Sequence, residues 1–387
     1  MVSVFSVFTS QLTHSRTLFV LLFFSLLAVT CQAEETPSLT QPALLKPGDT
    51  IMFIAPAGSL DVKRTKLAIN RLKELGYKVK HRDDLYTATA YLAGSDERRA
   101  EELMQAFTDP EVDAVFPGTG GYGTTRILDM LDYDVIRKNP KLFIGFSDIT
   151  ALHAAFNKKT GLITYHSPAP LYGLGTDTNL TPFSARYFFR AVVASPENSR
   201  DYVIECTGGG KKKVPQPVAI GKGKARGRLT GGNLSLLAAL EGTPYAIDTK
   251  DAILLVEDVG EAPYRIDRML QQLKMNGKLA PLRGVVVGQF TDTEPTVSKA
   301  DQFVGIVLKY WRKVQRLFMK VDEPVVKKKD PRFEAEGVLR QYFEPLGVPV
   351  LMNFPIGHYP MNCTLPLGGE VEIDADKATL TVIGRKK

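Results

Sequence analysis

Cysteine and histidine are scarce in this sequence, which holds three cysteines and five histidines among 387 residues. It contains no CxxC and no HExxH motif, and closely spaced ligands of these kinds are what zinc sites require. The sequence therefore argues against a metal-dependent hydrolase and predicts neither a metal nor an organic cofactor. Outside the N-terminal segment only Cys206 and Cys363 remain, too few for a disulfide framework. Whether these two pair stays open.

Aromatic residues are not interleaved with the basic clusters, although the formal net charge is +7. The positive charge is concentrated in Lys211–Lys213, Lys222–Arg228 and Lys327–Lys329. Nucleic-acid binders usually combine such clusters with stacking aromatics. Nucleic-acid binding is therefore disfavoured, whereas loose attraction to an anionic envelope polymer remains compatible with this charge.

The sequence has one long apolar run near its start, TLFVLLFFSLLAVT, which follows Arg16. The run is short for a membrane span, and the small residue Ala33 lies where a signal peptidase could cut. We expect residues 1–33 to be a signal peptide, the protein to be exported to the periplasm, and the mature chain to have no membrane span.

Strands and helices alternate after a Pro-rich lead-in over residues 34–45, which predicts an α/β layered domain with a mostly parallel sheet over residues 46–200. The expected strands are 50–55, 77–80, 112–116 and 142–146, and the expected helices are 62–75, 96–106 and 124–131. Residues 201–228, rich in Gly, Lys and Pro, are typical of a linker. A second, mixed α/β domain is expected over residues 229–387, with strands 252–256 and 284–289, helices 234–240 and 266–275, and a terminal hairpin from 371–373 to 379–382.

The stretch KLFIGFSDITALHAAF, residues 141–156, places Ser147 where a strand turns into a helix. Serine is a good N-cap, because its oxygen accepts one of the unpaired N–H groups of the helix that follows. A serine at a strand–helix elbow is also the position of a nucleophile. The stretch alone leaves both interpretations open.

The turn GTGGYG, residues 118–123, formally matches a dinucleotide fingerprint. It follows the third expected strand rather than the first, so this interpretation is weak. The glycines would equally serve a tight turn with positive φ. They could also let backbone N–H groups approach a developing oxyanion.

Two further segments carry groups that could act with a serine. Glu257 and Asp258 end an expected strand, and carboxylates there could orient a histidine or form a surface turn with Glu261 and Arg265. His358 lies in a Gly/Pro-rich loop and is a candidate for a functional histidine, and His166 is a similar candidate. A serine, a loop histidine and a strand-end carboxylate are the parts of a nucleophile–base–orienter triad. Their spacing permits this arrangement without proving it.

Seven motifs, in order along the chain, resemble those of the LD-carboxypeptidases, serine peptidases of the muramoyl-tetrapeptide carboxypeptidase and microcin-immunity type. The motifs are GDTIMFIAPAG, YLAGSDERRAEEL, GTGGYGTTRILDMLDY, KLFIGFSDITALH, GRLTGGNLSLL, LLVEDVGEAPYRIDRML and PIGHYPMN…LPLG. The resemblance covers nearly all of residues 46–385. It implies two domains with the active site at their interface, Ser147 as nucleophile, Glu257 as orienter and His358 as base, and assembly as a homodimer.

The resemblance also implies a reaction, in which the terminal D-alanine is removed from peptidoglycan stem tetrapeptides after the L-centre of the diamino acid. We expect the backbone N–H of Asp148 and that of the Gly120-Gly121 turn to stabilise the oxyanion. The alternatives are a microcin-immunity-like amide hydrolase and a non-catalytic binding protein for cell-wall peptides.

Three features depart from the family pattern. Thr119 replaces an arginine that relatives commonly carry before GGYG, which leaves the substrate preference open. Residues 293–341 are longer than the usual connection. The signal peptide is unusual in a family whose members are typically cytoplasmic.

Overall fold

The computed structural model describes residues 37–210, 213–293, 310 and 330–384. The chain divides after Pro37, and residues 38–387 form one compact unit with two β-sheets. The expected signal peptide and its cleavage site at Ala33 lie outside the described residues, as does most of the extended connection expected over residues 293–341.

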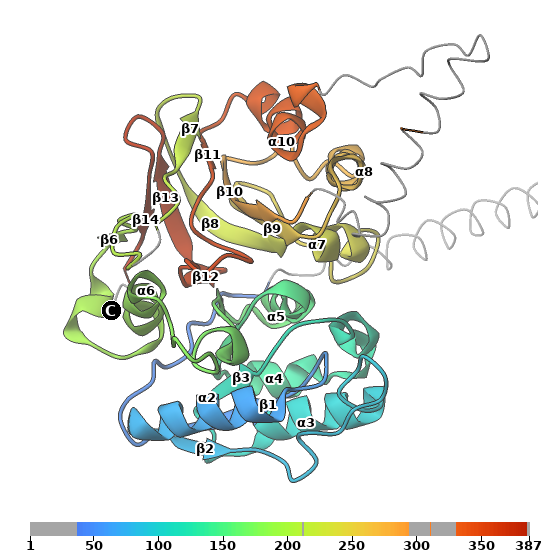
Figure 1. Cartoon of the computed structure of the whole chain (residues 1–387), viewed down its shortest axis with the longest axis vertical. Helices are drawn as coiled ribbons and strands as arrows, with labels where there is room; N and C mark the ends of the chain where they lie inside the picture. The colour runs from blue at the N-terminus through green and yellow to red at the C-terminus, as the bar shows by residue number, and fades with distance from the viewer. Residues whose placement is uncertain (1–36, 211–212, 294–309, 311–329, 385–387) are drawn as a thin grey trace, which may run out of the picture. The chain divides into compact units, whose positions relative to one another are not determined.

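The first sheet has the strand order β12-β5-β4-β3-β1-β2, and its pairs are parallel except for β12 with β5 (Figure 1). Its strands are β1 (Thr50–Ile54), β2 (Lys78–Lys80), β3 (Ala114–Pro117), β4 (Leu142–Gly145), β5 (Thr164–His166) and β12 (Leu365–Leu367). The central strands β1, β3 and β4 are buried throughout, because helices cover both faces of the sheet.

The helices of this region pack on opposite faces of the first sheet. They are α2 (Val62–Glu74), α3 (Asp96–Thr108), α4 (Tyr133–Lys138), α5 (Thr150–Thr160) and α6 (Pro182–Val192). Apolar residues of α3, α4 and α5 share a core with Met52 and Ile54 of β1, whereas those of α2 and α6 share a core with Ile51 and Phe53. Alternate residues of one strand thus face the two helical layers.

The second sheet is mixed, with the strand order β6-β14-β13-β8-β9-β10-β11-β7. Its strands are β6 (Tyr202–Val203), β7 (Val218–Ile220), β8 (Lys224–Asn233), β9 (Ala252–Val259), β10 (Gly284–Thr291), β11 (Val350–Met352), β13 (Glu370–Asp374) and β14 (Thr379–Val382). The run β8-β9-β10-β11 is parallel and the remaining pairs are antiparallel. The helices α7 (Leu234–Leu240), α8 (Pro263–Met275) and α10 (Ala335–Phe343) pack on one face.

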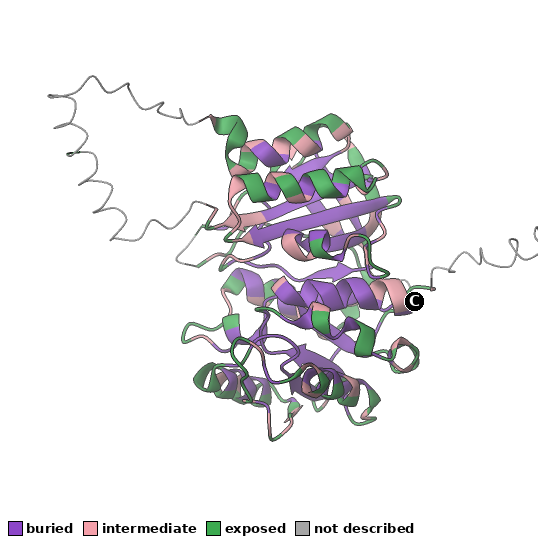
Figure 2. Cartoon of the chain, turned by 90° about the vertical axis from the view of Figure 1, so that its right-hand side faces the viewer, coloured by how far each residue is buried: buried purple, intermediate pink, exposed green. Residues whose placement is uncertain are grey.

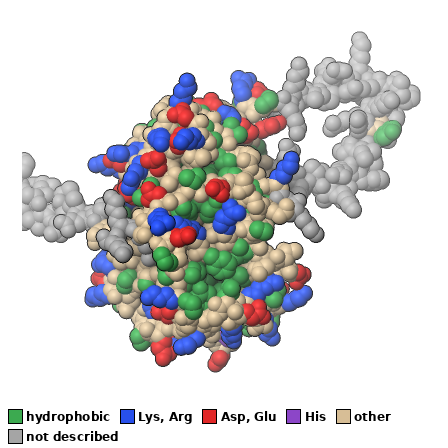
Figure 3. Space-filling view, turned by 90° about the vertical axis from the view of Figure 1, so that its left-hand side faces the viewer, with side chains coloured by type: hydrophobic (Ala, Val, Ile, Leu, Met, Phe, Trp, Pro, Cys, Tyr) green, Lys and Arg blue, Asp and Glu red, His purple; other side chains and the backbone are tan. Residues whose placement is uncertain are grey.

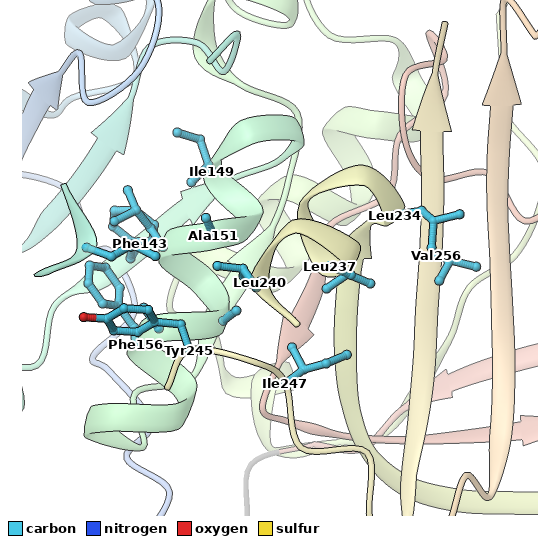
Figure 4. Close-up of a cluster of buried hydrophobic side chains, with 14 of the residues drawn as sticks. Phe143, Ile149, Ala151, Phe156, Leu234, Leu237, Leu240, Tyr245, Ile247 and Val256 are labelled. Atoms are coloured by element: carbon cyan, nitrogen blue, oxygen red, sulfur yellow. The ribbon is translucent and has the colours of Figure 1, made fainter. Parts of the chain in front are cut away.

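One hydrophobic core continues from the first sheet to the second. Figure 4 shows Phe143 and Phe156 on the side of the first sheet and Leu237, Leu240 and Val256 on the side of the second, and all belong to one buried cluster. Figure 2 shows the same arrangement by burial, with buried strands between helices whose outer faces are exposed. The two-domain α/β architecture expected from the sequence is confirmed, and the two domains share buried surface.

The expected elements of the first domain match the structure to within two residues, with one exception. Residues 124–131, predicted as a helix, form two 3-10 turns, Thr124–Arg126 and Leu128–Met130. Long-range contacts hold the side chains of this segment, since Arg126 pairs with Asp96 and Asp129 accepts a hydrogen bond from Tyr245.

The prediction of a linker over residues 201–228 is wrong, because this segment contains β6, β7 and the start of β8. Both β6 and β7 are short edge strands that pair on one side only, which tolerates Gly and Pro nearby. In β8 the basic residues alternate with smaller ones and pair with acids of β13, as in Arg226–Glu370 and Lys224–Asp374. These partners lie far along the chain, so composition alone suggested a loop.

Candidate active site

Ser147 stands at a strained elbow between β4 and α5. Its φ is 62°, in the left-handed region that residues with a β-carbon rarely adopt. Such strain costs on the order of 1–3 kcal/mol and is found where the surrounding structure imposes it for function. Neither the 3-10 turn Ser147–Ile149 nor α5 has a side-chain N-cap. The structure thus argues against the capping interpretation of Ser147.

The hydroxyl of Ser147 is in contact with His358, which is in contact with Glu257. The distance from His358 Nε2 to Ser147 Oγ is 3.0 Å, and that from His358 Nδ1 to Glu257 Oε2 is 2.7 Å. Ser147 follows the first sheet, whereas Glu257 lies near the end of β9 and His358 lies in the loop after β11. The structure therefore brings together the three side chains that the sequence proposed as a set.

Two glycines make room for the carboxylate of Glu257, which is completely buried. A β-carbon at Gly357 would lie 2.6 Å from Glu257 Oε2, and one at Gly288 would lie 3.0 Å from Glu257 Cβ. A larger residue at Gly357 would collide with the carboxylate itself, and one at Gly288 would collide first with Ile356 O, at 2.6 Å. The close approach of these segments to Glu257 therefore requires glycine at both positions.

Of the two acids that end β9, only Glu257 reaches the histidine. Asp258 is turned toward α7, where its carboxylate accepts hydrogen bonds from Asn233 Nδ2 at 2.8 Å and Ser235 Oγ at 2.7 Å. Burial raises the pKa of Asp258 above its ordinary value. Further along, Glu261 pairs with Arg265 at 3.6 Å, as the helical spacing predicted. The acidic segment therefore supplies one group to the site and a structural anchor beside it.

The pKa of His358 reflects two opposing influences. Burial lowers it, but the hydrogen bond to Glu257 and the charge of that carboxylate outweigh burial, so the pKa lies above its ordinary value. A carboxylate on Nδ1 also fixes the tautomer in which Nε2 carries no proton and can accept one from Ser147. The pair is arranged as a general base with its orienting group.

Gly120 keeps open a small space beside the serine. A β-carbon at this position would lie 3.2 Å from Ser147 Oγ and 3.2 Å from the backbone nitrogen of Asp148. Gly121 has a φ of 105°, which favours glycine. The carboxylate of Asp148 points elsewhere and accepts a hydrogen bond from Thr124 N at 2.9 Å. Asp148 can therefore contribute only its backbone N–H to this space.

Comparison with known protein families shows to which family the chain belongs. Residues 51–167 match the LD-carboxypeptidase N-terminal domain, and residues 226–373 match the LD-carboxypeptidase C-terminal domain. These two matches cover more than half of the sequence. The chain belongs to the LD-carboxypeptidase family. The resemblance noted in the sequence is thus confirmed, and the chain is an enzyme of the serine LD-carboxypeptidase type.

This LD-carboxypeptidase is similar to several proteins along most of its length. A probable murein peptide carboxypeptidase of Bacillus subtilis is 36% identical over 88% of this chain and 94% of its own length. The solved structure of an MccF-like protein from Bacillus anthracis has a TM-score of 0.72 and 27% identity, and the match covers 89% of this chain and all of that one. A muramoyltetrapeptide carboxypeptidase from Oxalobacter formigenes has a TM-score of 0.66 and 29% identity, with coverage of 87% and 99%.

A cavity of about 660 Å³ opens at the serine of this LD-carboxypeptidase. One wall is the turn Thr119–Gly121, a second is the segment between Tyr172 and Ser184, and a third is the loop that carries His358. Thr119, where the family resemblance led us to expect an arginine, lines this cavity. The segment 172–184 was not predicted from the sequence. The sequence pattern that could have indicated it is a run of Gly, Thr and Asn soon after the carboxyl end of β5, because α/β sheets bind ligands at that end of their strands.

Two further histidines and the two cysteines in the described part of the chain lie outside this group. His153 is buried and bridges Gly145 O and Thr164 Oγ1, and burial lowers its pKa to about 4. His166 is buried beside Phe146, and neither of its ring nitrogens has a hydrogen-bond partner among the described residues. Within that same part of the chain, no three His, Cys, Asp or Glu side chains are grouped to hold a metal ion. Cys206 and Cys363 are free thiols.

Proposed function

We propose that this LD-carboxypeptidase removes the terminal D-alanine from peptidoglycan stem tetrapeptides, cutting after the L-centre of the diamino acid. The observation that carries the proposal is the chain of contacts from Ser147 through His358 to Glu257 at the wall of the cavity. The names of the murein and muramoyltetrapeptide carboxypeptidases among its relatives support the choice of substrate.

In the first half of the reaction, Ser147 Oγ attacks the carbonyl carbon of the bond to D-alanine while His358 Nε2 takes the hydroxyl proton. The oxygen of the tetrahedral intermediate receives hydrogen bonds from the N–H of Asp148 and from the Gly120-Gly121 turn. Collapse of the intermediate breaks the C–N bond, and His358 returns the proton to the leaving amine. The shortened peptide remains as an ester on Ser147.

In the second half, a water molecule attacks the ester. His358 Nε2 takes a proton from this water and delivers it to Ser147 Oγ as the ester C–O bond breaks. Glu257 accepts the Nδ1–H of the imidazole throughout, which stabilises the imidazolium that forms twice in the cycle. The reaction as proposed uses the substrate, water, these three side chains and the backbone N–H groups that receive the oxyanion.

The same proposal places the enzyme outside the inner membrane. The apolar run before Ala33 has the length and the flanks of a signal peptide. In that compartment the enzyme would meet stem peptides that are still attached to glycan. No helix in the described part of the chain is long and apolar enough to cross a membrane. The homodimer implied by the family resemblance stays a prediction.

Two other functions compete with this one. The MccF-like neighbour and the Escherichia coli microcin C7 self-immunity protein MccF, 26% identical over 90% of this chain, favour cleavage of an amide in a toxic nucleotide peptide. An exported location argues against that activity, because such toxins are processed inside the cell. A non-catalytic binding protein for cell-wall peptides would share the cavity but would have no use for a strained serine in contact with a histidine.

The test is incubation of the protein with purified stem tetrapeptide, followed by mass spectrometry. We expect the loss of a single alanine with wild type and no loss with Ser147→Ala. An unchanged tetrapeptide with wild type, at enzyme concentrations that cleave the nucleotide peptide, would replace the proposed substrate by the microcin-type one. Binding of the tetrapeptide without cleavage of either compound would favour the binding protein.

A further inference from the structure

The loop that carries His358 is closed by a hydrogen bond to the side chain of Asn362. Gly357 N donates to Asn362 Oδ1 at 3.1 Å, and both atoms are buried. Tyr359 N donates to Gly357 O at 2.8 Å, which tightens the turn around the histidine. Because Gly357 directly precedes His358 and also touches Glu257, a shift of this turn would move the imidazole. Asn362 thus fixes the shape of the loop from within.

Ser184 of α6 fixes the same loop from outside. Its hydroxyl accepts a hydrogen bond from Asn362 N at 3.0 Å and donates one to Pro360 O at 3.1 Å. It also accepts one from the hydroxyl of Thr181 at 3.0 Å. A hydroxyl has one proton and two lone pairs, so these three hydrogen bonds use the full hydrogen-bonding capacity of the Ser184 hydroxyl. Ser184 is 1% exposed and Asn362 is 4% exposed, so water does not readily replace either partner.

The helix that bears Ser184 is anchored in both sheets. Phe188 of α6 packs in the core of the first sheet, where its ring lies 6.3 Å from that of Phe116. Phe183 and Tyr187 of the same helix pack in the core that covers the second sheet, together with Phe354 and Ile356 of the histidine loop. Through Ser184, the loop is therefore tied to an element that is fixed relative to the nucleophile's own sheet.

Strand β10 holds the loop from the other side. Gln289 N donates to Ile356 O at 2.9 Å, just before the histidine, and Thr291 Oγ1 donates to the carbonyl of His358 at 3.3 Å, a long contact. From His358 to Asn362 the loop is held by Ser184 of α6. The contact between His358 Nε2 and Ser147 crosses from one domain to the other, and displacement of a reacting group by about 1 Å can cost roughly 10²-fold in rate. A group that sets the distance between the domains at this point therefore matters for the chemistry.

We propose that Ser184 and Asn362 are positioning residues, which act on catalysis through His358 by holding its loop against α6. The inference rests on the proposed function only in that His358 is the general base. Both residues also line the cavity, so the competing explanation is direct contact with the substrate. The two explanations differ in the kinetic parameter that they affect.

The experiment compares Ser184→Ala with Ser184→Thr, which keeps the hydroxyl. We expect Ser184→Ala to lower kcat for the tetrapeptide about 10- to 100-fold, with KM changed less than about threefold, and Ser184→Thr to recover most of the loss. Thr160→Val is the matched control. It removes another buried hydroxyl, which donates to Phe156 O and accepts from Leu162 N at the far end of α5. We expect it to leave kcat unchanged.

The rate of covalent labelling by a fluorophosphonate gives a second readout that needs no peptide. We expect Ser184→Ala and Asn362→Ala to slow labelling by the same factor as kcat, with Asn362→Ala serving as the second variant should Ser184→Ala fail to fold. A rise in KM with kcat and labelling unchanged would show a substrate contact, and equal effects of Ser184→Ala and Thr160→Val would show a purely structural role. Either result overturns the proposal. Slower labelling in these variants, with no alanine released by wild type, would keep the positioning role and reject only the proposed substrate.

Discussion

The nucleophile side and the histidine side of the site are held in place by different means. Ser147 takes its left-handed backbone conformation at a short elbow, between a strand and a helix that are its immediate neighbours in the sequence. His358 stands on a loop, and its position depends on Glu257, 101 residues away, and on the clamp formed by Ser184 and Asn362. One partner is positioned by local strain and the other by distant contacts.

The two sides of the site also differ in where their buried carboxylates lie. On the histidine side the buried carboxylate of Glu257 contacts the imidazole. On the nucleophile side the buried carboxylate of Asp148 is bonded to Thr124 instead, and the backbone nitrogen of Asp148 lies beside Ser147 Oγ. On one outer face of the molecule, Figure 3 shows hydrophobic side chains gathered in the lower half, with Lys, Arg, Asp and Glu interspersed above and around them. Variants on the two sides of the site should therefore fail differently, those on the nucleophile side independently of pH and those on the histidine side with a shifted pH profile.

The largest effects are expected where the two sides meet. Ser147→Ala and His358→Ala should each lower kcat by roughly 10³- to 10⁶-fold, because removal of either group leaves the other without a function. For the same reason the double variant should be no slower than the slower single variant. The release of D-alanine under saturating substrate is the measurement. Near-normal turnover by Ser147→Ala would show that the elbow serine is not the nucleophile.

The next largest effect concerns the carboxylate. Glu257→Gln should lower kcat by about 10²- to 10⁴-fold, because the amide no longer stabilises the imidazolium. His358 must be neutral to accept a proton, so activity is lost as the pH falls through its pKa, which Glu257 now holds above the ordinary value. Without that charge, burial dominates and the pKa falls. The acidic limb of the kcat/KM profile should therefore move to lower pH, and a limb that stays in place would refute this role of Glu257.

A smaller effect is expected on the nucleophile side. In Gly120→Ala the new methyl group would occupy the space between Ser147 Oγ and the N–H of Asp148, where the oxyanion should form. We expect kcat to fall about 10²- to 10³-fold, the range seen when an oxyanion donor is removed. The shape of the pH profile should be that of wild type, in contrast to Glu257→Gln. Full activity, with a melting temperature equal to that of wild type, would place the oxyanion elsewhere.

The smallest effect concerns Thr119, which lines the cavity. Arginine could grip a substrate carboxylate with two hydrogen bonds, whereas threonine offers one hydroxyl and more room. Thr119→Arg should shift the ratio of kcat/KM for free over disaccharide-linked tetrapeptide upward by about one to two decades, equivalent to roughly 1.5–3 kcal/mol. An unmoved ratio would mean that Thr119 does not contact the substrate.

Local sequence patterns were sufficient for most of the fold and for naming candidates for the three central side chains. The strands β1 and β4 are short apolar runs, and α2 and α7 have clear helical spacing, so their bounds could be predicted closely. Ser147 could be singled out because a strand, a turn and a helix follow one another within a few residues. The family resemblance then assigned roles to Glu257 and His358.

Other features could not be predicted, because their causes are distant in the sequence. The first half of β8, up to Arg228, was predicted as a linker because the acids of β13 that pair with its basic residues lie far along the chain. Ser184 lies in an ordinary amphipathic helix, and Asn362 lies in an irregular loop. Neither has a local pattern that marks it, and their importance arises only where α6 meets the histidine loop. The contact between Ser147 and His358 could not be predicted from local patterns either, because the two residues lie 211 positions apart.

The central claim is that His358, held by Glu257, activates Ser147 as a nucleophile. The most direct measurement is the intact mass of the protein after reaction with a fluorophosphonate, with peptide mapping of the adduct. We predict one adduct per chain on Ser147 for wild type, none on that peptide for Ser147→Ala, and labelling of His358→Ala slowed by roughly 10³-fold or more. Labelling of wild type on another residue, or labelling of His358→Ala at the wild-type rate, would contradict the account.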